Sequence, residues 1–281
     1  MGTSKDKEDI QYLPFPPTKV TPATPPAEPP PPQLPPEKPP LRDWESDSPE
    51  SRLRDPAYIA PCLAAFCGLV FGFLLFAVLD KKYHSSAYFQ LIGGMLPFQF
   101  FALGAALLSL VPQFRLLGFW ETLDIRPNPC PLSTHIKAVL KKLLVLFPSL
   151  ILVNFLCFII LEKCGVSMQP QEIGTMLMQN AEDPLFLALS CFTTVVTAPV
   201  AEEILFRLVL FRSARALAPR WAMFLTCLAF ALVHASPQFI VGLALLAWQL
   251  QNCRRQGGLL RAILLHAAYN ATSIIQLYIM A

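Results

Sequence analysis

Long apolar runs, separated by short charged segments, dominate the chain after its first 56 residues. These uncharged runs extend over Pro56 to Leu79, Tyr83 to Phe114, Leu143 to Leu161, Pro184 to Ala201, Trp221 to Cys253 and Ala262 to Ala281. Several reach the roughly 20 residues that a helix needs to cross a hydrocarbon core about 30 Å thick. The pattern therefore predicts an all-α, polytopic transmembrane helix bundle.

The run from Trp221 to Cys253 is too long for one helix across a bilayer. We divide it at Ala235-Ser236-Pro237, because Pro237 lacks the N–H that would continue the hydrogen-bond ladder. The prediction is then about seven spans, at residues 57–79, 88–111, 141–161, 184–211, 221–235, 238–252 and 259–279.

Composition and charge agree with a membrane protein. The chain is 54% hydrophobic and 15% charged over 281 residues, which is too apolar for a soluble domain of this size. Lys and Arg collect on the cytoplasmic side of membrane proteins, and with the N-terminus inside most of them fall there. The predicted outer side holds only Lys81, Lys82 and Lys163. The net charge of +3 thus reflects topology, and nothing indicates a nucleic-acid partner.

Residues 1–56 contain more than half of the 28 prolines and mix acidic with basic side chains. Such a segment cannot form a core, so we predict a disordered, Pro-rich cytoplasmic tail. The stretch PPPPQLPPEKPP is either a plain spacer or a ligand for an SH3-like or WW-like partner. No signal or transit peptide is evident, which favours a bacterial cytoplasmic membrane over the endoplasmic reticulum as the location.

Candidate chemistry begins in APVAEEILFR, residues 198–207, where three ionisable groups lie in an apolar stretch. A charge at the centre of a bilayer costs roughly 2.5–3.5 kcal/mol, so such groups suggest a functional site. Glu203 and Arg207 are four residues apart and can form an ion pair on one helix face. Glu202 points elsewhere and needs a partner from another helix. A structural polar clamp between helices is the alternative interpretation.

Further polar residues follow in the next apolar runs. His234 comes one helical turn after Phe230, and His266 and Asn270 are four residues apart on one face. His84 and His135, the other two histidines, fall in predicted loops. By their distance from the predicted span ends, Glu202, His234 and His266 lie between the midplane and the inner surface, so that one pocket can hold them together with Asn270. We therefore expect one polar site that opens toward the cytoplasm or the lipid.

Three short motifs in these runs, EEILFR, FALVH and HAAYN, fit the patterns EExxxR, FxxxH and HxxxN. In this order they resemble the CAAX prenyl protease and bacteriocin-processing family, whose eukaryotic member is the type II CAAX prenyl endopeptidase. The resemblance implies a catalytic four-helix core at residues 184–281, preceded by accessory helices at 57–183. By motif it implies Glu202 as the catalytic glutamate, Glu203, Arg207 and Phe230 as supporting residues, His234 as the group that assists the water, and His266 and Asn270 as the groups that complete the site. Leu208 departs from the family, many of whose members have Gly after the Arg.

The predicted function is an intramembrane endopeptidase that hydrolyses a peptide bond of a peptide or lipidated-protein substrate. Glu202 and His234 would activate water, and His266 and Asn270 would stabilise the oxyanion. A metal version would use Glu202, His234 and His266 as zinc ligands, and the absence of HExxH favours direct glutamate catalysis. A transporter, immunity factor or scaffold is the non-catalytic alternative, although the first three spans contain no inverted copy of the charged motif.

Overall fold

The computed structural model describes residues 56–83, 86–123, 125, 131–166, 172–234 and 236–280. Residues 43–281 group into one compact unit. The predicted Pro-rich tail and its SH3-like or WW-like partner site lie outside the described residues, apart from Pro56. All regular structure in the described ranges is helical, which confirms the predicted fold class.

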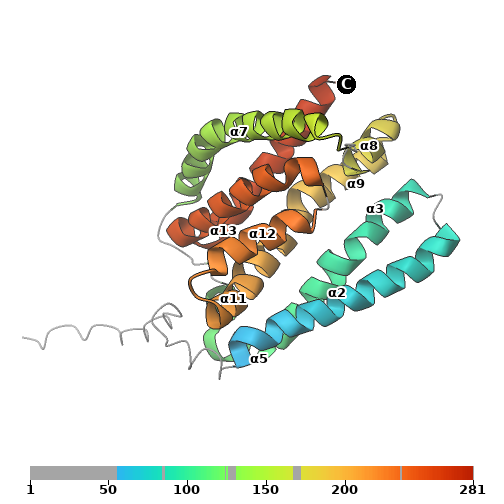
Figure 1. The fold of residues 1–281 in the computed structure, drawn as a ribbon. Coiled ribbons are helices and arrows are strands. Elements are labelled where there is room, and N and C mark those ends of the chain that lie inside the picture. The colour runs from blue at the N-terminus through green and yellow to red at the C-terminus, as the bar shows by residue number, and fades with distance from the viewer. Residues whose placement is uncertain are drawn as a thin grey trace, which may run out of the picture. The chain divides into compact units, whose positions relative to one another are not determined.

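The helices follow one another with short connections (Figure 1). In chain order they are α2 (Pro56–Tyr83), α3 (Ala87–Met95), η1 (Leu96–Ala102), α4 (Leu103–Ser109), α5 (Val111–Leu117), α6 (Phe119–Thr122), α7 (Leu132–Lys163), α8 (Glu172–Gln179), α9 (Pro184–Phe192), η2 (Thr193–Thr197), α10 (Ala198–Glu202), η3 (Glu203–Leu210), α11 (Phe211–Leu217), α12 (Ala222–Leu232), η4 (Pro237–Phe239) and α13 (Ile240–Met280). The segments η1, η2 and η3 are π-helical, and η4 is a 3₁₀ turn.

Among the described residues, four continuous helical segments are long and apolar enough to cross a bilayer: Ile59–Tyr83, Ala87–Ser109, Leu132–Lys163 and Pro184–Leu217. The split of the long apolar run is also found, because α12 ends at Leu232 and α13 begins at Ile240. Non-helical backbone at Gly257 and Gly258 divides α13 in two. Each predicted span thus has a helix, while the number of membrane crossings stays a prediction.

The start of α7 corrects the predicted boundary. The helix begins at Leu132 rather than near Lys141, and His135, which was expected in a loop, lies within it and is only 2% exposed. The lysines of this segment suggested a loop because they interrupt the apolar run. Lys137 and Lys141 are exposed, whereas His135 and Val139 are buried on another side of the helix, and Lys142 lies on that same side and is only partly buried.

Close helix contact holds the accessory helices together. Gly68 and Gly72 are one turn apart on α2, and a Cβ atom at Gly68 would lie 2.3 Å from the carbonyl oxygen of Phe101. A Cβ at Gly72 would lie 2.6 Å from the Cα of Pro97. Only glycine allows the two backbones to approach so closely, as in small-residue contacts between transmembrane helices. This contact fixes η1 and α4 against α2.

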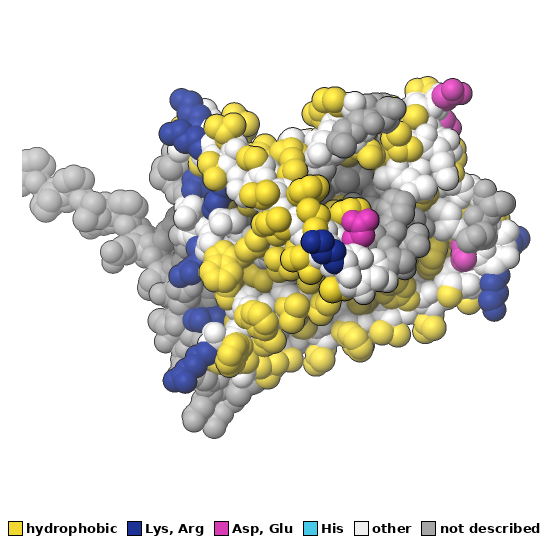
Figure 2. All heavy atoms as spheres, turned by 45° about the horizontal axis from the view of Figure 1, so that its top comes forward, with side chains coloured by type: hydrophobic (Ala, Val, Ile, Leu, Met, Phe, Trp, Pro, Cys, Tyr) yellow, Lys and Arg dark blue, Asp and Glu magenta, His cyan; other side chains and the backbone are white. Residues whose placement is uncertain are grey.

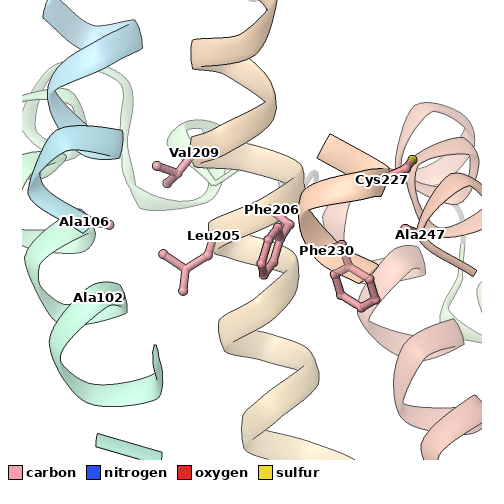
Figure 3. Close-up of a cluster of buried hydrophobic side chains, with 8 residues drawn as sticks. All are labelled: Ala102, Ala106, Leu205, Phe206, Val209, Cys227, Phe230 and Ala247. Atoms are coloured by element: carbon pink, nitrogen blue, oxygen red, sulfur yellow. The ribbon is translucent and has the colours of Figure 1, made fainter. Parts of the chain in front are cut away.

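A hydrophobic cluster joins these accessory helices to the C-terminal ones (Figure 3). Leu205 and Val209 of η3 point toward Ala102 and Ala106, and Phe206 meets Phe230 edge-to-face at 5.2 Å between ring centroids. The small alanines let η1 and α4 pack closely on η3. Burial of these apolar groups therefore positions the charged helix between two layers of helices.

Outward-facing side chains are mostly apolar. Leu63, Phe66 and Leu74 of α2 and Leu144 and Val145 of α7 are all more than half exposed, as expected for lipid-facing positions. Figure 2 shows hydrophobic side chains across one face, with most of its Lys and Arg side chains along the left edge. This arrangement agrees with a bilayer-embedded chain whose basic residues gather at one end.

Candidate active site

The charged pair Glu203 and Arg207 lies at the centre of the described core. Arg207 Nε donates to Glu203 Oε2 at 3.1 Å, and both side chains are 0% exposed. The Arg207 guanidinium also lies 4.8 Å from the centre of the Phe230 ring, a cation–π distance. The predicted ion pair is therefore present. Its two charges tolerate burial because each has a partner.

Glu203 also connects its helix to α13. Its second oxygen, Oε1, lies 3.0 Å from His266 Nδ1, and His266 is 3% exposed. A carboxylate that already accepts from arginine can only accept again, so His266 Nδ1 is the donor. In the neutral imidazole, His266 Nε2 then has no proton and presents a lone pair on the far side of the ring.

His234 lies in the turn that follows α12, held by backbone contacts. Its Nδ1 is 2.7 Å from the carbonyl oxygen of Phe230, and Ser236 Oγ donates to the His234 carbonyl at 3.1 Å. A carbonyl only accepts, so His234 Nδ1 donates and the neutral ring again presents an unprotonated Nε2. The Phe230 ring contacts both histidines, with centroids 4.8 Å from His234 and 5.8 Å from His266.

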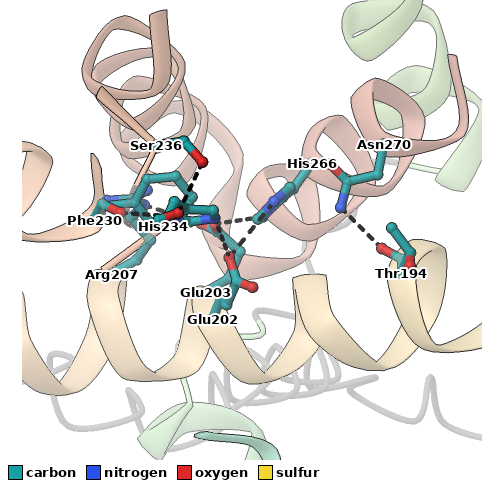
Figure 4. Close-up of polar contacts among 9 residues, drawn as sticks. All are labelled: Thr194, Glu202, Glu203, Arg207, Phe230, His234, Ser236, His266 and Asn270. Atoms are coloured by element: carbon teal, nitrogen blue, oxygen red, sulfur yellow. Dashed lines mark hydrogen bonds and ion pairs between the residues drawn. The ribbon is translucent and has the colours of Figure 1, made fainter. Parts of the chain in front are cut away.

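Glu202 faces both of these ring nitrogens (Figure 4). Its Oε2 lies 3.9 Å from His234 Nε2 and 3.8 Å from His266 Nε2, which is too far for direct hydrogen bonds. The same oxygen is buried and has no hydrogen-bond partner among the described residues. Three acceptor atoms from three segments of the chain therefore converge, and none of them supplies a proton to the others.

Accessibility differs among these three side chains. His234 is 28% exposed and Glu202 is 20% exposed, whereas His266 is 3% exposed. Part of the Glu202 side chain and part of His234 can thus be reached from outside the bundle, although Glu202 Oε2 itself is buried. His266 forms the inner wall of the site.

Asn270 lies one turn beyond His266 and contacts a different helix. Its Nδ2 donates to the carbonyl oxygen of Thr194 in η2 at 2.8 Å. In the same segment, the Thr197 hydroxyl donates to Gln99 Oε1 of η1 at 2.7 Å. The sequence-based prediction missed Thr194 and Gln99. The signal for Thr194 was the threonine cluster at residues 193–197 within an apolar run, and the signal for Gln99 was a polar side chain within another such run.

The side chains that converge here, Glu202, His234 and His266, are also of the types that bind zinc. However, neighbouring ligands in a tetrahedral zinc site lie roughly 3.3 Å apart, closer than the separations here. Within the described ranges, no group of three or more His, Cys, Asp or Glu side chains has the geometry of a metal site. The residues as placed do not fit zinc, and the mechanism proposed below uses no metal.

Comparison with known proteins bears on this same region. Residues 184–272 match the family model described as type II CAAX prenyl endopeptidase Rce1-like. No curated protein and no solved structure matches the chain. The matched segment runs from α9 into α13 and contains all three motifs. Together with four helices long and apolar enough to span a bilayer, the match identifies an integral membrane protein. Residues 184–272 are therefore an Rce1-like domain of the CAAX protease family, as the sequence motifs indicated.

Proposed function

We propose that this protein is an intramembrane endopeptidase that hydrolyses a peptide bond of a membrane-associated peptide or lipidated protein. The convergence of Glu202 Oε2 with the Nε2 atoms of His234 and His266 carries the proposal. These three atoms all accept hydrogen bonds, and none of them donates to another. They therefore favour a small molecule that can donate two hydrogens to them and still has a lone pair for attack on the substrate. Water has these properties.

In this mechanism Glu202 is the general base and His234 orients the water. The water oxygen attacks the carbonyl carbon of the substrate, and Glu202 accepts the proton that the water loses. Collapse of the tetrahedral intermediate breaks the C–N bond, and the same proton passes to the leaving nitrogen. The products are an amine and a carboxylic acid, which then releases its proton to solvent or to the amine. The greater exposure of Glu202 and His234 supports these roles, because the substrate must reach them.

The developing oxyanion needs donors, and two groups are suited to supply them. Asn270 uses one amide hydrogen for the Thr194 carbonyl, and its second hydrogen can point to the substrate. His266 would become a donor through Nε2 by taking up a proton from solvent after the water that its lone pair held has attacked. The Glu203 carboxylate, 3.0 Å from Nδ1, would then offset the imidazolium charge. Glu203 and Arg207 thus act as positioning residues for His266.

Replacing the proposed base tests the mechanism directly. Glu202→Gln keeps the shape of the side chain but cannot accept the proton, so we expect cleavage to fall by about 10²–10⁴-fold. Purified variants in nanodiscs would be incubated with membrane-associated peptides, and the products identified by mass spectrometry. Glu162→Gln, an exposed glutamate at the end of α7, is the matched control. Retained turnover in a folded Glu202→Gln protein would refute the assignment.

The cytoplasmic N-terminus belongs to the same proposal. The gathering of Lys and Arg side chains at one end, visible in Figure 2, supports it through the positive-inside rule. Cys164, which is exposed just after α7, offers a test. In intact cells, a variant in which Cys164 is the single remaining cysteine should react with a membrane-impermeant thiol reagent added from outside. Reaction only after permeabilisation would reverse the topology.

A further inference from the structure

A second group of polar side chains lies between α7 and the break in α13, apart from the site described above. Arg261 Nε donates to His135 Nδ1 at 3.3 Å, and Lys142 Nζ lies 3.6 Å from Cys253 Sγ. His135 and Lys142 are seven residues apart on α7 and therefore lie two turns apart on the same side of the helix, so their partners Arg261 and Cys253 place both cations along one contact between α7 and α13. We call His135, Lys142 and Arg261 the basic cluster.

The break in α13 shapes this cluster. Gly258 has φ of 76°, a conformation that favours glycine, and a new helix begins after it. A Cβ atom at Gly257 would lie 2.2 Å from Arg261 Nε, so the guanidinium lies directly against the glycine backbone. The first backbone N–H groups of the new helix lack intrahelical partners and carry a partial positive charge. They add to the charge of Arg261 at the same place.

No carboxylate among the described residues forms an ion pair with Lys142 or Arg261. Glu203, whose charge also reaches Cys253, is already bonded to Arg207 and His266. Lys142 and Arg261 are only partly buried, so an anion from outside can reach them. Two cations along the same helix contact without a negative partner disfavour each other, and an anion that reaches both would relieve that repulsion.

The surroundings favour a lipid over a soluble anion. On α7, Leu140, Leu144 and Val145 flank Lys142 in sequence and are 57%, 78% and 67% exposed, as expected for side chains that touch acyl chains. Basic sites between transmembrane helices at one membrane surface bind the head groups of acidic lipids. We propose that the basic cluster binds the phosphate of an acidic phospholipid whose acyl chains lie along α7.

Retention of lipid by the purified full-length protein tests the proposal without any measurement of cleavage. The protein would be extracted from bilayers of phosphatidylcholine and phosphatidylglycerol, and the bound lipid measured by native mass spectrometry. Lys142→Gln with Arg261→Gln should weaken phosphatidylglycerol binding by at least tenfold, because each cation supplies a charge-assisted hydrogen bond. Lys137→Gln with Lys141→Gln removes the same charge from exposed positions on α7 and should retain the lipid.

Each outcome supports or overturns the proposal. Selective loss in the cluster variant supports it, and Lys142→Gln alone, expected to give a smaller loss, serves if the double variant does not fold. Equal retention of phosphatidylglycerol by both double variants overturns it. Binding of phosphatidylcholine as tightly as phosphatidylglycerol also overturns it, and so does stabilisation of the lipid-free protein by inorganic phosphate. A raised KM for peptides with a free C-terminal carboxylate, with lipid retention unchanged, would assign the cluster to the substrate instead. Glu202→Gln should bind lipid normally, so failure here is separate from failure of the proposed peptidase.

Discussion

The two adjacent glutamates should differ in how their replacement by glutamine changes stability, although both replacements should impair cleavage. Glu203 accepts from Arg207 and from His266, and both members of the Glu203–Arg207 pair are 0% exposed. Glu203→Gln removes the negative charge and leaves the Arg207 guanidinium buried without a counter-ion. Breaking a buried pair by removal of one partner costs about 3–5 kcal/mol. We expect the free energy of unfolding to fall by this amount.

The double variant Glu203→Gln with Arg207→Met separates loss of the charge pair from general damage. It removes both charges and replaces the guanidinium with an apolar side chain that can still contact Phe230. Replacement of a complete buried pair is often close to neutral, so we expect most of the lost stability to return. Cleavage should stay low, since His266 lacks its carboxylate partner in both variants. Glu202→Gln, by contrast, should abolish cleavage with little loss of stability.

Unfolding in mixed micelles, followed by circular dichroism as the denaturing detergent is increased, measures these differences. A double-mutant cycle over Glu203 and Arg207 then gives their coupling energy. If Glu203→Gln alone left stability unchanged, or if the double variant were no more stable than the single one, the buried pair would not hold this core together. The structural role given to Glu203 would then be wrong.

Three further predictions concern other contacts. Gly68→Ala should lower the free energy of unfolding by about 1–3 kcal/mol, because the added Cβ overpacks against η1. Gly104→Ala, whose added Cβ meets nothing within 4 Å, should leave that free energy unchanged. Unfolding in denaturing detergent compares the two variants. Asn270→Ala should reduce kcat by about 10²-fold with little change in KM, and Ser273→Ala should not; an unchanged kcat for Asn270→Ala would contradict the oxyanion role. Asp183 accepts from the Tyr88 hydroxyl and from backbone N–H groups at the start of α9, which holds the pKa of its carboxyl below the ordinary value. The Asp183 carboxylate should therefore stabilise α9 above about pH 4, and this stabilisation should be lost as the pH falls further. The loss should be seen as faster hydrogen exchange in the first turn of α9. Asp183→Asn should lack this pH dependence.

Apolar runs and their interruptions locate the helices well because the bilayer requires every backbone group to be satisfied within a segment. The same signal fails at helix ends. Helix α7 continues through Lys137, Lys141 and Lys142, since a helix can leave the hydrocarbon and continue with one polar and one buried side. Charged residues mark the membrane surface, and they do not mark the end of the helix.

Contacts within one helix were predictable from the sequence, and contacts between helices were predictable only in part. The four-residue spacing predicted the Glu203–Arg207 ion pair, and the need of Glu202 for a partner on another helix indicated the histidines. Spacing could not show that Glu203 also bonds His266, or that Asn270 bonds a carbonyl in η2. These depend on how the helices rotate, which side-chain packing decides. The π-helical register of η1, η2 and η3 has no residue signature, although such segments are frequent at functional sites.

His266 links the two glutamates through opposite sides of one ring, with Nδ1 at 3.0 Å from Glu203 and Nε2 at 3.8 Å from Glu202. The bond to Glu203 fixes the plane of the ring and the nitrogen that carries the proton. It therefore also fixes the position of the lone pair that faces Glu202 and the proposed water. A change at Glu203 should alter the orientation of His266 before it alters Glu202. For this reason, loss of the buried charge pair and loss of catalysis should accompany each other at Glu203, even though only Glu202 is placed to touch the reacting water.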